Sequence, residues 1–135
     1  TTWSRIIDPI VPVFTLLATA DDRRAGFATC ILHPRTWAIE PACYLEDLFV
    51  EESQRGRGIA SQLLPALIGR ARAIGKHVMV AGIESGNAAS IQLHTRNGFR
   101  ITGEMPQVGV KFGNWLDLTF MQLTLDTRSA PEADP

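Results

Sequence analysis

The sequence lacks most of the features that would place it outside the ordinary globular proteins. Two of its 135 residues are cysteine, one is tyrosine, and 7% are aromatic. No apolar run is long enough to span a membrane, and no charged segment precedes one as in a secretory signal, so we expect neither element and no membrane partner. The formal net charge of −1 provides no excess of positive charge, so we expect no nucleic-acid partner.

The residue types that bind metals and form disulfides are equally sparse. Cys30 and Cys43 both lie inside expected strands, which favours two buried, reduced thiols in a cytoplasmic protein over a disulfide or a metal pair. His33, His77 and His94 are scattered without the spacing of metal ligands. We therefore expect a cytoplasmic protein with no metal site.

Length and local composition predict one domain with a short tail. A chain of 135 residues can bury a full hydrophobic core, and we assign residues 1–125 to a single domain. Residues 126–135 are rich in small, charged and proline residues, which predicts a disordered tail. Charge changes sign once: residues 40–52 carry five acids and no base, and residues 55–76 carry five bases and no acid.

Hydrophobic patterning predicts a mixed α/β fold. After a short helix or turn in residues 1–9, we expect strands at 13–19, 26–33, 44–50, 77–83 and 115–125, with strand-like pieces at 99–102 and 108–112 interrupted around Pro106. A loop is expected from Pro34 to Pro41, and helices at 58–74 and 88–97. Because a helix links the strands at 44–50 and 77–83, these two should run parallel.

The switch in charge falls on a glycine-rich loop between a strand and a helix, Glu46-Asp-Leu-Phe-Val-Glu-Glu-Ser-Gln-Arg-Gly-Arg-Gly-Ile-Ala60. Gly56 and Gly58 allow backbone N–H groups to converge, and the following helix adds its positive N-terminal end, which favours a phosphate or pyrophosphate ligand. A Walker loop would need a lysine after Gly58, and a dinucleotide fingerprint would need a third glycine or alanine where Ser61 stands.

Two motifs resemble one family. Gln54-Arg-Gly-Arg-Gly-Ile-Ala60 resembles the Q/R-x-x-G-x-G/A pyrophosphate loop of the GNAT superfamily of N-acetyltransferases. Asn87-Ala-Ala-Ser90 with Leu93-His-Thr-Arg-Asn-Gly-Phe99 resembles the N-x-x-[SA]…L-[YH]-x-x-x-G-F segment of the same superfamily. Periodicity alone places Asn87, Ser90, His94 and Asn97 in one polar stripe, which would otherwise be a solvent-exposed helix face.

The resemblance implies a strongly twisted mixed sheet flanked by helices, with acetyl-coenzyme A lying where two central parallel strands splay apart. Its pantetheine arm would pair with backbone groups of residues 48–50. The cofactor-binding residues implied are Leu48, Phe49, Val50, Gln54, Arg55, Gly56, Arg57, Gly58, Ile59, Ala60, Asn87 and Ser90. At subfamily level, residues 33–37 and 43–50 look like diamine and polyamine acetyltransferases, whereas residues 80–83, 108–117 and 120–122 look like phosphinothricin acetyltransferases.

The chain departs from the family at its start, where the usual opening strand and helix are missing. The strand at Val13 is therefore expected to expose an edge. Either a partner subunit covers this edge, which predicts a homodimer, or the chain is incomplete.

Amine acetylation requires a group that removes a proton from the incoming ammonium. We expect Glu46 to be this base and His94, at the position near the thioester in the family, to be the general acid. Strand alternation would place Glu46 with Tyr44 and Leu48 on one face, and Asp47 with Leu45 and Phe49 on the other, so that only one acid faces the substrate.

Further residues are expected at the acceptor side. Trp37, Tyr44 and Asp47 are predicted to bind the substrate, with Trp115 and Asp117 as further candidates. The reaction expected is direct transfer of acetyl from the thioester to the primary amine of a small molecule or amino acid. A peptide or protein acetyltransferase and a non-catalytic acyl-coenzyme A sensor are the alternatives.

Overall fold

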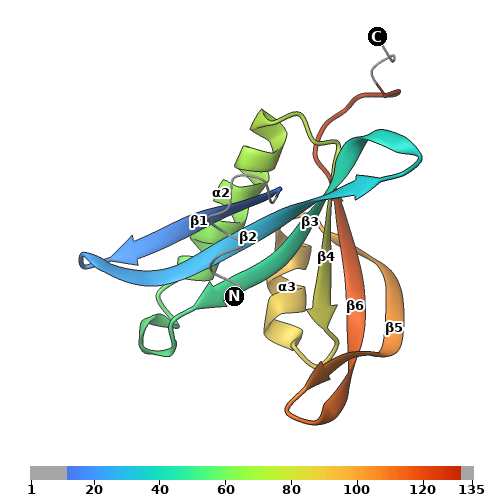
Figure 1. Ribbon diagram of the computed structural model, residues 1–135. Helices are drawn as coiled ribbons and strands as arrows, with labels where there is room; N and C mark the ends of the chain where they lie inside the picture. Colours follow the sequence, from blue (N-terminus) through green and yellow to red (C-terminus); the bar gives the residue numbers. More distant parts are fainter. Residues whose placement is uncertain (1–11, 132–135) are drawn as a thin grey trace.

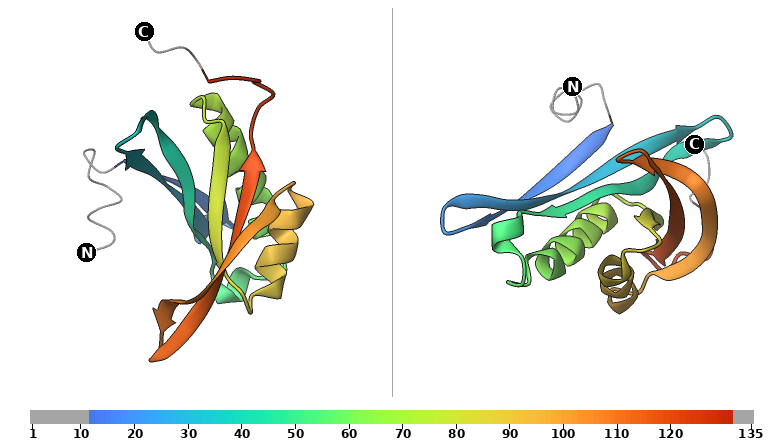
Figure 2. Two further views of the ribbon diagram at one scale, coloured as in Figure 1. Left: turned by 90° about the vertical axis from the view of Figure 1, so that its right-hand side faces the viewer. Right: turned by 90° about the horizontal axis from the view of Figure 1, so that it is seen from below.

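The six strands of the computed structural model, which describes residues 12–131, form one mixed sheet in the order β1-β2-β3-β4-β6-β5 (Figure 1). Both helices lie on the same side of this sheet (Figure 2). The elements are β1 Val13–Ala20, β2 Arg23–Arg35, β3 Ala38–Val50, the 3-10 turn η1 Glu52–Gln54, α2 Ile59–Ala73, β4 Val78–Glu84, α3 Ala88–Arg96, β5 Arg100–Lys111 and β6 Asn114–Thr124. The mixed α/β fold expected from the sequence is confirmed.

The first three strands are joined by tight hairpins. Asp21 and Asp22 both adopt positive φ, 52° and 60°, as in the turn that best matches the twist of two antiparallel strands. The loop predicted from Pro34 to Pro41 is wrong, because β2 continues to Arg35 and β3 begins at Ala38 after a two-residue turn. The prolines are accommodated near the ends of the strands, where ladder hydrogen bonds are dispensable.

The predicted interruption around Pro106 is also wrong in part, because β5 runs from Arg100 to Lys111. Three residues of β5 are accommodated opposite one residue of β6 between Met105 and Gly109. Within this bulge Gln107 has a φ of 56°, and its N–H donates to the Asp117 carboxylate at 2.8 Å. An edge strand tolerates proline because one side of its backbone has no ladder to complete.

The parallel pair expected at the centre of the sheet is present but short. β3 pairs with β4 only from Cys43 to Leu45, opposite Met79 to Ala81. Beyond these residues the two strands have no described pairing, while β3 continues to pair with β2 as far as Val50. The strands therefore splay apart after Leu45.

A bulge in β3 lies at the same point. Asp47 pairs with Thr29 and Leu45 with Cys30, so Glu46 has no residue opposite it. Leu45 is buried in the core and Leu48 packs against that core. The alternation expected from the sequence, with Leu45 and Leu48 on opposite faces, is therefore wrong, because the extra residue reverses the side on which the following residues point.

The hydrophobic core lies between the sheet and the helices. Most of its helical part comes from one side of α2, where Leu63, Leu64, Leu67, Ile68 and Ala71 are buried, and α3 adds Leu93. Cys30 and Cys43 are free thiols and belong to the same core, so the burial expected from the sequence is confirmed. Their mutual hydrogen bond and burial raise the pKa of the Cys30 thiol.

The C-terminal tail is held to the domain by side-chain contacts at its start. The helix or turn expected in residues 1–9 lies outside the described residues. Asp126 bonds His77 at 2.7 Å, and the Arg128 guanidinium donates to the Gly75 carbonyl at 3.0 Å. The start of the tail is thus attached to the domain, while its predicted disorder stays a prediction. None of the helices in the described part of the chain is long and apolar enough to cross a membrane.

Candidate active site

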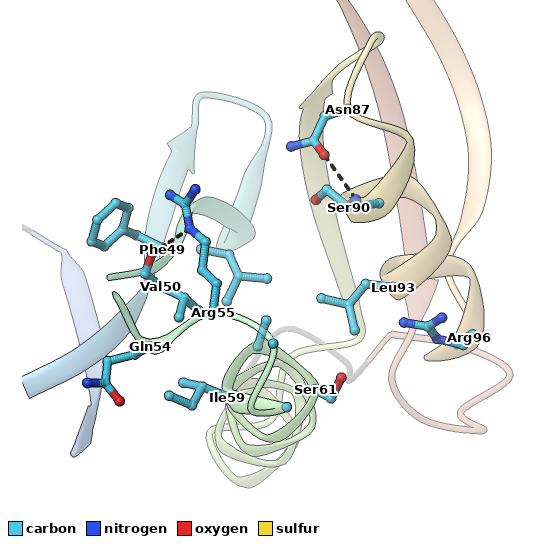
Figure 3. A pocket seen from close by; sticks show the side chains of 15 residues that line it. Phe49, Val50, Gln54, Arg55, Ile59, Ser61, Asn87, Ser90, Leu93 and Arg96 are labelled. Atoms are coloured by element: carbon cyan, nitrogen blue, oxygen red, sulfur yellow. Dashed lines mark hydrogen bonds between the residues drawn. The ribbon is translucent and has the colours of Figure 1, made fainter. Parts of the chain in front are cut away.

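A cavity of about 650 Å³ lies between the end of β3, the glycine loop, the start of α2 and the side of α3 (Figure 3). This volume is typical of sites for small organic ligands, roughly 300–1,000 Å³. The residues that the sequence assigns to the cofactor all line this cavity, with the single exception of Arg57. Segments separated by some thirty residues in the sequence thus form one site.

The glycine loop has the conformation expected of an anion-binding turn. Gly56 and Gly58 adopt φ of 78° and 76°, which side chains with a β-carbon rarely tolerate, and no heavy atom lies within 4 Å of the position where a β-carbon would stand. Gly58 caps α2 without any side-chain hydrogen bond. The first N–H groups of α2 therefore remain available to an anionic ligand at its positive end.

The two arginines of the loop point to different places. Arg55 lines the cavity, and its Nε donates to the Val50 carbonyl at 3.1 Å, which holds the guanidinium across the end of β3 (Figure 3). Arg57 instead lies 3.3 Å from the Asp21 carboxylate on the β1–β2 turn. Its predicted contact with the cofactor is not supported by this placement.

The wall opposite the loop is formed by α3. Asn87, Ser90, Leu93 and Arg96 follow one another every three residues, and all line the cavity. The Asn87 carboxamide accepts from the Ser90 N–H at 3.1 Å, which makes it the N-cap of this helix as the sequence predicts. Of the polar stripe expected on this helix, Asn87 and Ser90 therefore line the cavity, and His94 and Asn97 do not.

His94 is buried, with 1% of its surface exposed, and does not line the cavity. Its Nδ1 lies 2.7 Å from the Ser90 carbonyl, and a carbonyl can only accept, so Nδ1 carries the proton. Its Nε2 therefore holds a lone pair, and it has no hydrogen-bond partner among the described residues. Burial lowers the pKa of the ring, opposed in part by the Ser90 carbonyl. The general-acid role stays a prediction that this geometry does not favour.

Three polar side chains, those of Tyr44, Glu46 and Asp47, lie on the face of the sheet that points away from the core, beside the point where β3 and β4 separate. Tyr44 pairs with Ile31 and Asp47 with Thr29, two positions apart on β2, so both point away from the core. Burial and the charge of Glu46 raise the pKa of Tyr44. Burial, and then the neighbouring Asp47 carboxylate, raise the pKa of Glu46. Burial likewise raises the pKa of Asp47. The bulge thus brings Glu46 and Asp47 together near Tyr44, where alternation had predicted that they would separate.

The remaining candidates lie elsewhere. Trp37 is in the turn between β2 and β3 with 77% of its surface exposed, seven residues along the strand from Tyr44, or roughly 20 Å. Trp115 is 67% exposed near the β5–β6 turn. The Asp117 carboxylate accepts the hydrogen bond from Gln107 in the bulge of β5. None of these three lines the cavity. Within the described residues, no three His, Cys, Asp or Glu side chains gather as a metal site.

Sequence reasoning missed four residues that line the cavity: Ser61, Ala89, Leu93 and Arg96. Ser61 and Ala89 adjoin residues that were assigned. Leu93 and Arg96 could have been found by continuing the helix from Ser90 in steps of three rather than four, since both steps are neighbours on a helix surface. The sequence pattern alone does not decide whether the residue three or the residue four positions after Ser90 faces the cavity.

The chain belongs to the acetyltransferase (GNAT) family, whose sequence profile matches residues 3–99. A solved structure described as yncA, a putative acetyltransferase from Salmonella typhimurium with its cofactor acetyl-CoA, superimposes with a TM-score of 0.81. It is 47% identical, over 89% of this chain and 69% of that one.

Two curated relatives have named substrates. The L-methionine sulfoximine/L-methionine sulfone acetyltransferase of Pseudomonas paraeruginosa is 72% identical over 85 residues, 62% of this chain and 49% of that protein. The phosphinothricin N-acetyltransferase of Alcaligenes faecalis is 30% identical over 124 residues, 91% of this chain and 61% of that protein. This chain spans about half the length of the first of these relatives.

Proposed function

We propose that this protein is an acetyl-coenzyme A-dependent N-acetyltransferase for the primary amine of a small molecule. The observation that carries the proposal is the position of the cavity. It joins the glycine loop to the point where β3 and β4 separate, and Glu46 and Asp47 lie beside that point on the other face of the sheet. A cofactor and an amine can therefore approach one opening from opposite sides.

The residues that line the cavity fit an elongated, anionic cofactor. The glycine loop, the N-terminus of α2 and Arg55 suit its pyrophosphate. In the described part of the chain, the backbone of β3 beyond Leu45 has no partner strand on the β4 side to compete for hydrogen bonds. Acetyl-coenzyme A supplies the acetyl group as a thioester. The solved relative from Salmonella typhimurium holds this cofactor.

Glu46 and Asp47 suit the arrival of a cation. A protonated alkyl amine resembling lysine has a pKa of about 10.4, so only about one molecule in a thousand is nucleophilic at neutral pH. Carboxylates beside the splay attract the ammonium, and the raised pKa of Glu46 makes it a stronger base toward that proton. We assign Glu46 the role of base, with Asp47 and Tyr44 lining the acceptor side.

The cavity favours direct transfer in a ternary complex. A covalent acetyl-enzyme would need a strong nucleophile at the cavity, and both thiols of the described structure are buried in the core instead. The nitrogen of the amine would therefore attack the acetyl carbon itself while the base removes its proton. The C–S bond of the thioester would break, and coenzyme A would leave as a thiolate that takes up a proton to become the free thiol.

The acceptor is a small amine, and the names of the relatives favour an amino acid derivative over a polyamine. Those relatives act on methionine sulfoximine, methionine sulfone and phosphinothricin. The polyamine resemblance of the first half, and the acidic pair at the splay, make a diamine the other acceptor to test. An α-amino group with a pKa near 8 would depend less on Glu46 than a diamine would.

Release of free thiol from acetyl-coenzyme A tests the proposal. The panel contains methionine sulfoximine, methionine sulfone, phosphinothricin, common amino acids, spermidine, short diamines and a lysine peptide, with calorimetric binding of the cofactor in parallel. Turnover of one class of small amines is the expected result. Turnover of the peptide alone would favour the protein acetyltransferase, and binding without any turnover would favour the sensor.

We also propose a homodimer and a cytoplasmic location. β1 lies at an edge of the sheet, and the β5–β6 hairpin, which extends from the molecule in Figure 2, exposes Val110, Phe112 and Trp115. Exposed apolar groups of this kind often mark an interface. The free thiols Cys30 and Cys43 suit a reducing compartment. Light scattering measures the mass of the particle, and a monomer would contradict the dimer.

A further inference from the structure

A second arginine lines the cavity on the wall opposite the glycine loop. Arg96 is the last residue of α3, three residues after Leu93, and its side chain reaches along the cavity on the side away from Arg55 (Figure 3). The N-x-x-[SA] and glycine-loop motifs do not assign it.

The Arg96 guanidinium has no ion pair or hydrogen bond within the described residues. Some other arginines are engaged by the protein: Arg57 by Asp21, Arg72 by the Leu125 carbonyl, and Arg128 by Asp126. Among residues 12–131, no acidic side chain lines the cavity to neutralise Arg96. An unpaired guanidinium at a ligand cavity has all five donors available to an anion.

The chemistry of coenzyme A supplies two separate anions. One is the pyrophosphate, toward which the glycine loop, the α2 N-terminus and Arg55 supply donors. The other is the phosphomonoester on the 3′ oxygen of the ribose, which lies apart from the pyrophosphate and requires its own donor. The planar fork of an arginine suits a phosphate monoester through two parallel hydrogen bonds.

We propose that Arg96 binds the 3′-phosphate of coenzyme A and selects this carrier over acyl-pantetheine carriers that lack that phosphate. The inference rests on the proposed function, because it assumes that coenzyme A occupies the cavity. It adds a determinant of carrier specificity on α3, at a position that the glycine loop does not reach.

The location of Arg96 at the end of a helix provides a competing explanation. A cation in the last turn stabilises a helix through its macrodipole, whatever ligand is bound. Arg70 occupies the same kind of position, in the last turn of α2, and does not line the cavity. The pair Arg96→Gln and Arg70→Gln therefore separates contact with the ligand from an effect on the helix.

Isothermal titration calorimetry with coenzyme A and with 3′-dephospho-coenzyme A tests the inference without any turnover. The unaltered protein is expected to bind coenzyme A at least about tenfold more tightly than the dephospho form, as a charge-assisted pair of hydrogen bonds implies. Arg96→Gln should make the two affinities equal, because it weakens the binding of coenzyme A alone. Arg70→Gln should keep both affinities, and thermal unfolding without ligand should show that both variants are folded.

Each other outcome overturns the inference. Equal affinity of the unaltered protein for the two ligands would mean that the 3′-phosphate is not recognised. If Arg96→Gln lowered the affinity for both ligands equally, Arg96 would lie at the pyrophosphate instead. If it lowered neither affinity, Arg96 would not contact the cofactor. An unaltered protein that binds both ligands equally and still acetylates amines would overturn the inference and leave the proposed function intact, whereas failure of the unaltered protein to bind either ligand would overturn both.

Discussion

The hydroxyl of Tyr44 on β3 lies close to Gly82 of β4, the residue that follows the last pair joining the two strands. A β-carbon on Gly82 would stand 2.5 Å from this oxygen and 3.3 Å from the Phe120 ring. The Tyr44 and Phe120 rings are themselves neighbours, with centroids 6.4 Å apart. Glycine at position 82 thus leaves room for the Tyr44 and Phe120 side chains to pack beside the point where β3 and β4 separate.

Gly82→Ala should displace Tyr44, because the new methyl group has no room between the hydroxyl and the Phe120 ring. We expect a loss of about 1–3 kcal/mol in the free energy of unfolding, together with a higher KM for the amine. Urea unfolding and steady-state kinetics measure the two effects.

Gly69→Ala is the matched control. Gly69 lies inside α2, and a β-carbon there would meet nothing within 4 Å. Alanine is the better helix former, so the free energy of unfolding should rise by about 0.5–1 kcal/mol with unchanged KM. A Gly82→Ala protein as stable and active as the unaltered one would contradict the close contact with Tyr44.

Glu46→Gln should lower kcat/KM by roughly 10²- to 10⁴-fold, because an amide cannot accept the ammonium proton. Burial and the Asp47 charge raise the pKa of Glu46. In the unaltered protein kcat/KM should therefore fall as the pH drops through this raised value, and the acidic limb should flatten in the variant. Rates measured from pH 5 to 9 test this.

Glu52→Gln controls for the loss of one negative charge near the cavity. Glu52 lies in η1, is exposed, and does not line the cavity. Its replacement should leave the pH profile unchanged. A Glu46→Gln profile that coincides with the unaltered one would remove Glu46 from the role of base.

His94→Phe should leave turnover within a few-fold of normal, because His94 does not line the cavity. The pH dependence of stability should change instead. Burial lowers the pKa of His94 below its ordinary value of 6.5, so below pH 6.5 the unfolded chain binds a proton that the folded protein resists. Stability is therefore lost as the pH falls from about 6.5 toward the folded pKa.

Urea unfolding at pH 5.5 and 7.5 measures this loss. The difference between the two pH values should shrink in His94→Phe and persist in His33→Asn, since His33 is exposed. A turnover number reduced by orders of magnitude in folded His94→Phe would restore the general-acid role.

Asn87→Ala should combine two losses. The N-cap hydrogen bond to the Ser90 N–H disappears, at a cost of about 1 kcal/mol in the free energy of unfolding, and the cavity loses a carboxamide. Asn87→Ser keeps a capping oxygen but removes the carboxamide. If Asn87 contacts the cofactor, Asn87→Ser should retain most of the stability and still bind acetyl-coenzyme A more weakly, as calorimetry would show. Normal binding by both variants would limit Asn87 to capping.

The local elements of this protein follow from its sequence. Gly58 and Gly75 bracket the periodic apolar positions of α2, Asn87 caps α3, and the apolar run of β4 indicates a buried strand. The glycine loop follows as well, because positive φ at Gly56 and Gly58 depends on the absence of a β-carbon. These features rest on interactions within a few residues of the chain.

The side of each element that meets the cavity was decided only by the tertiary structure. From Ser90 the next neighbours on a helix surface are Leu93 and His94, and packing against Phe99, whose ring lies 4.9 Å from that of His94, turns His94 inward and leaves Leu93 and Arg96 at the cavity.

The same holds for the strand that carries the proposed base. The bulge opposite Thr29 and Cys30 reverses the side on which the rest of β3 points, and so places Glu46 and Asp47 together. Sequence determines the period of a strand or helix, but its phase at a given residue depends on which neighbour it packs against. That neighbour is distant in the chain.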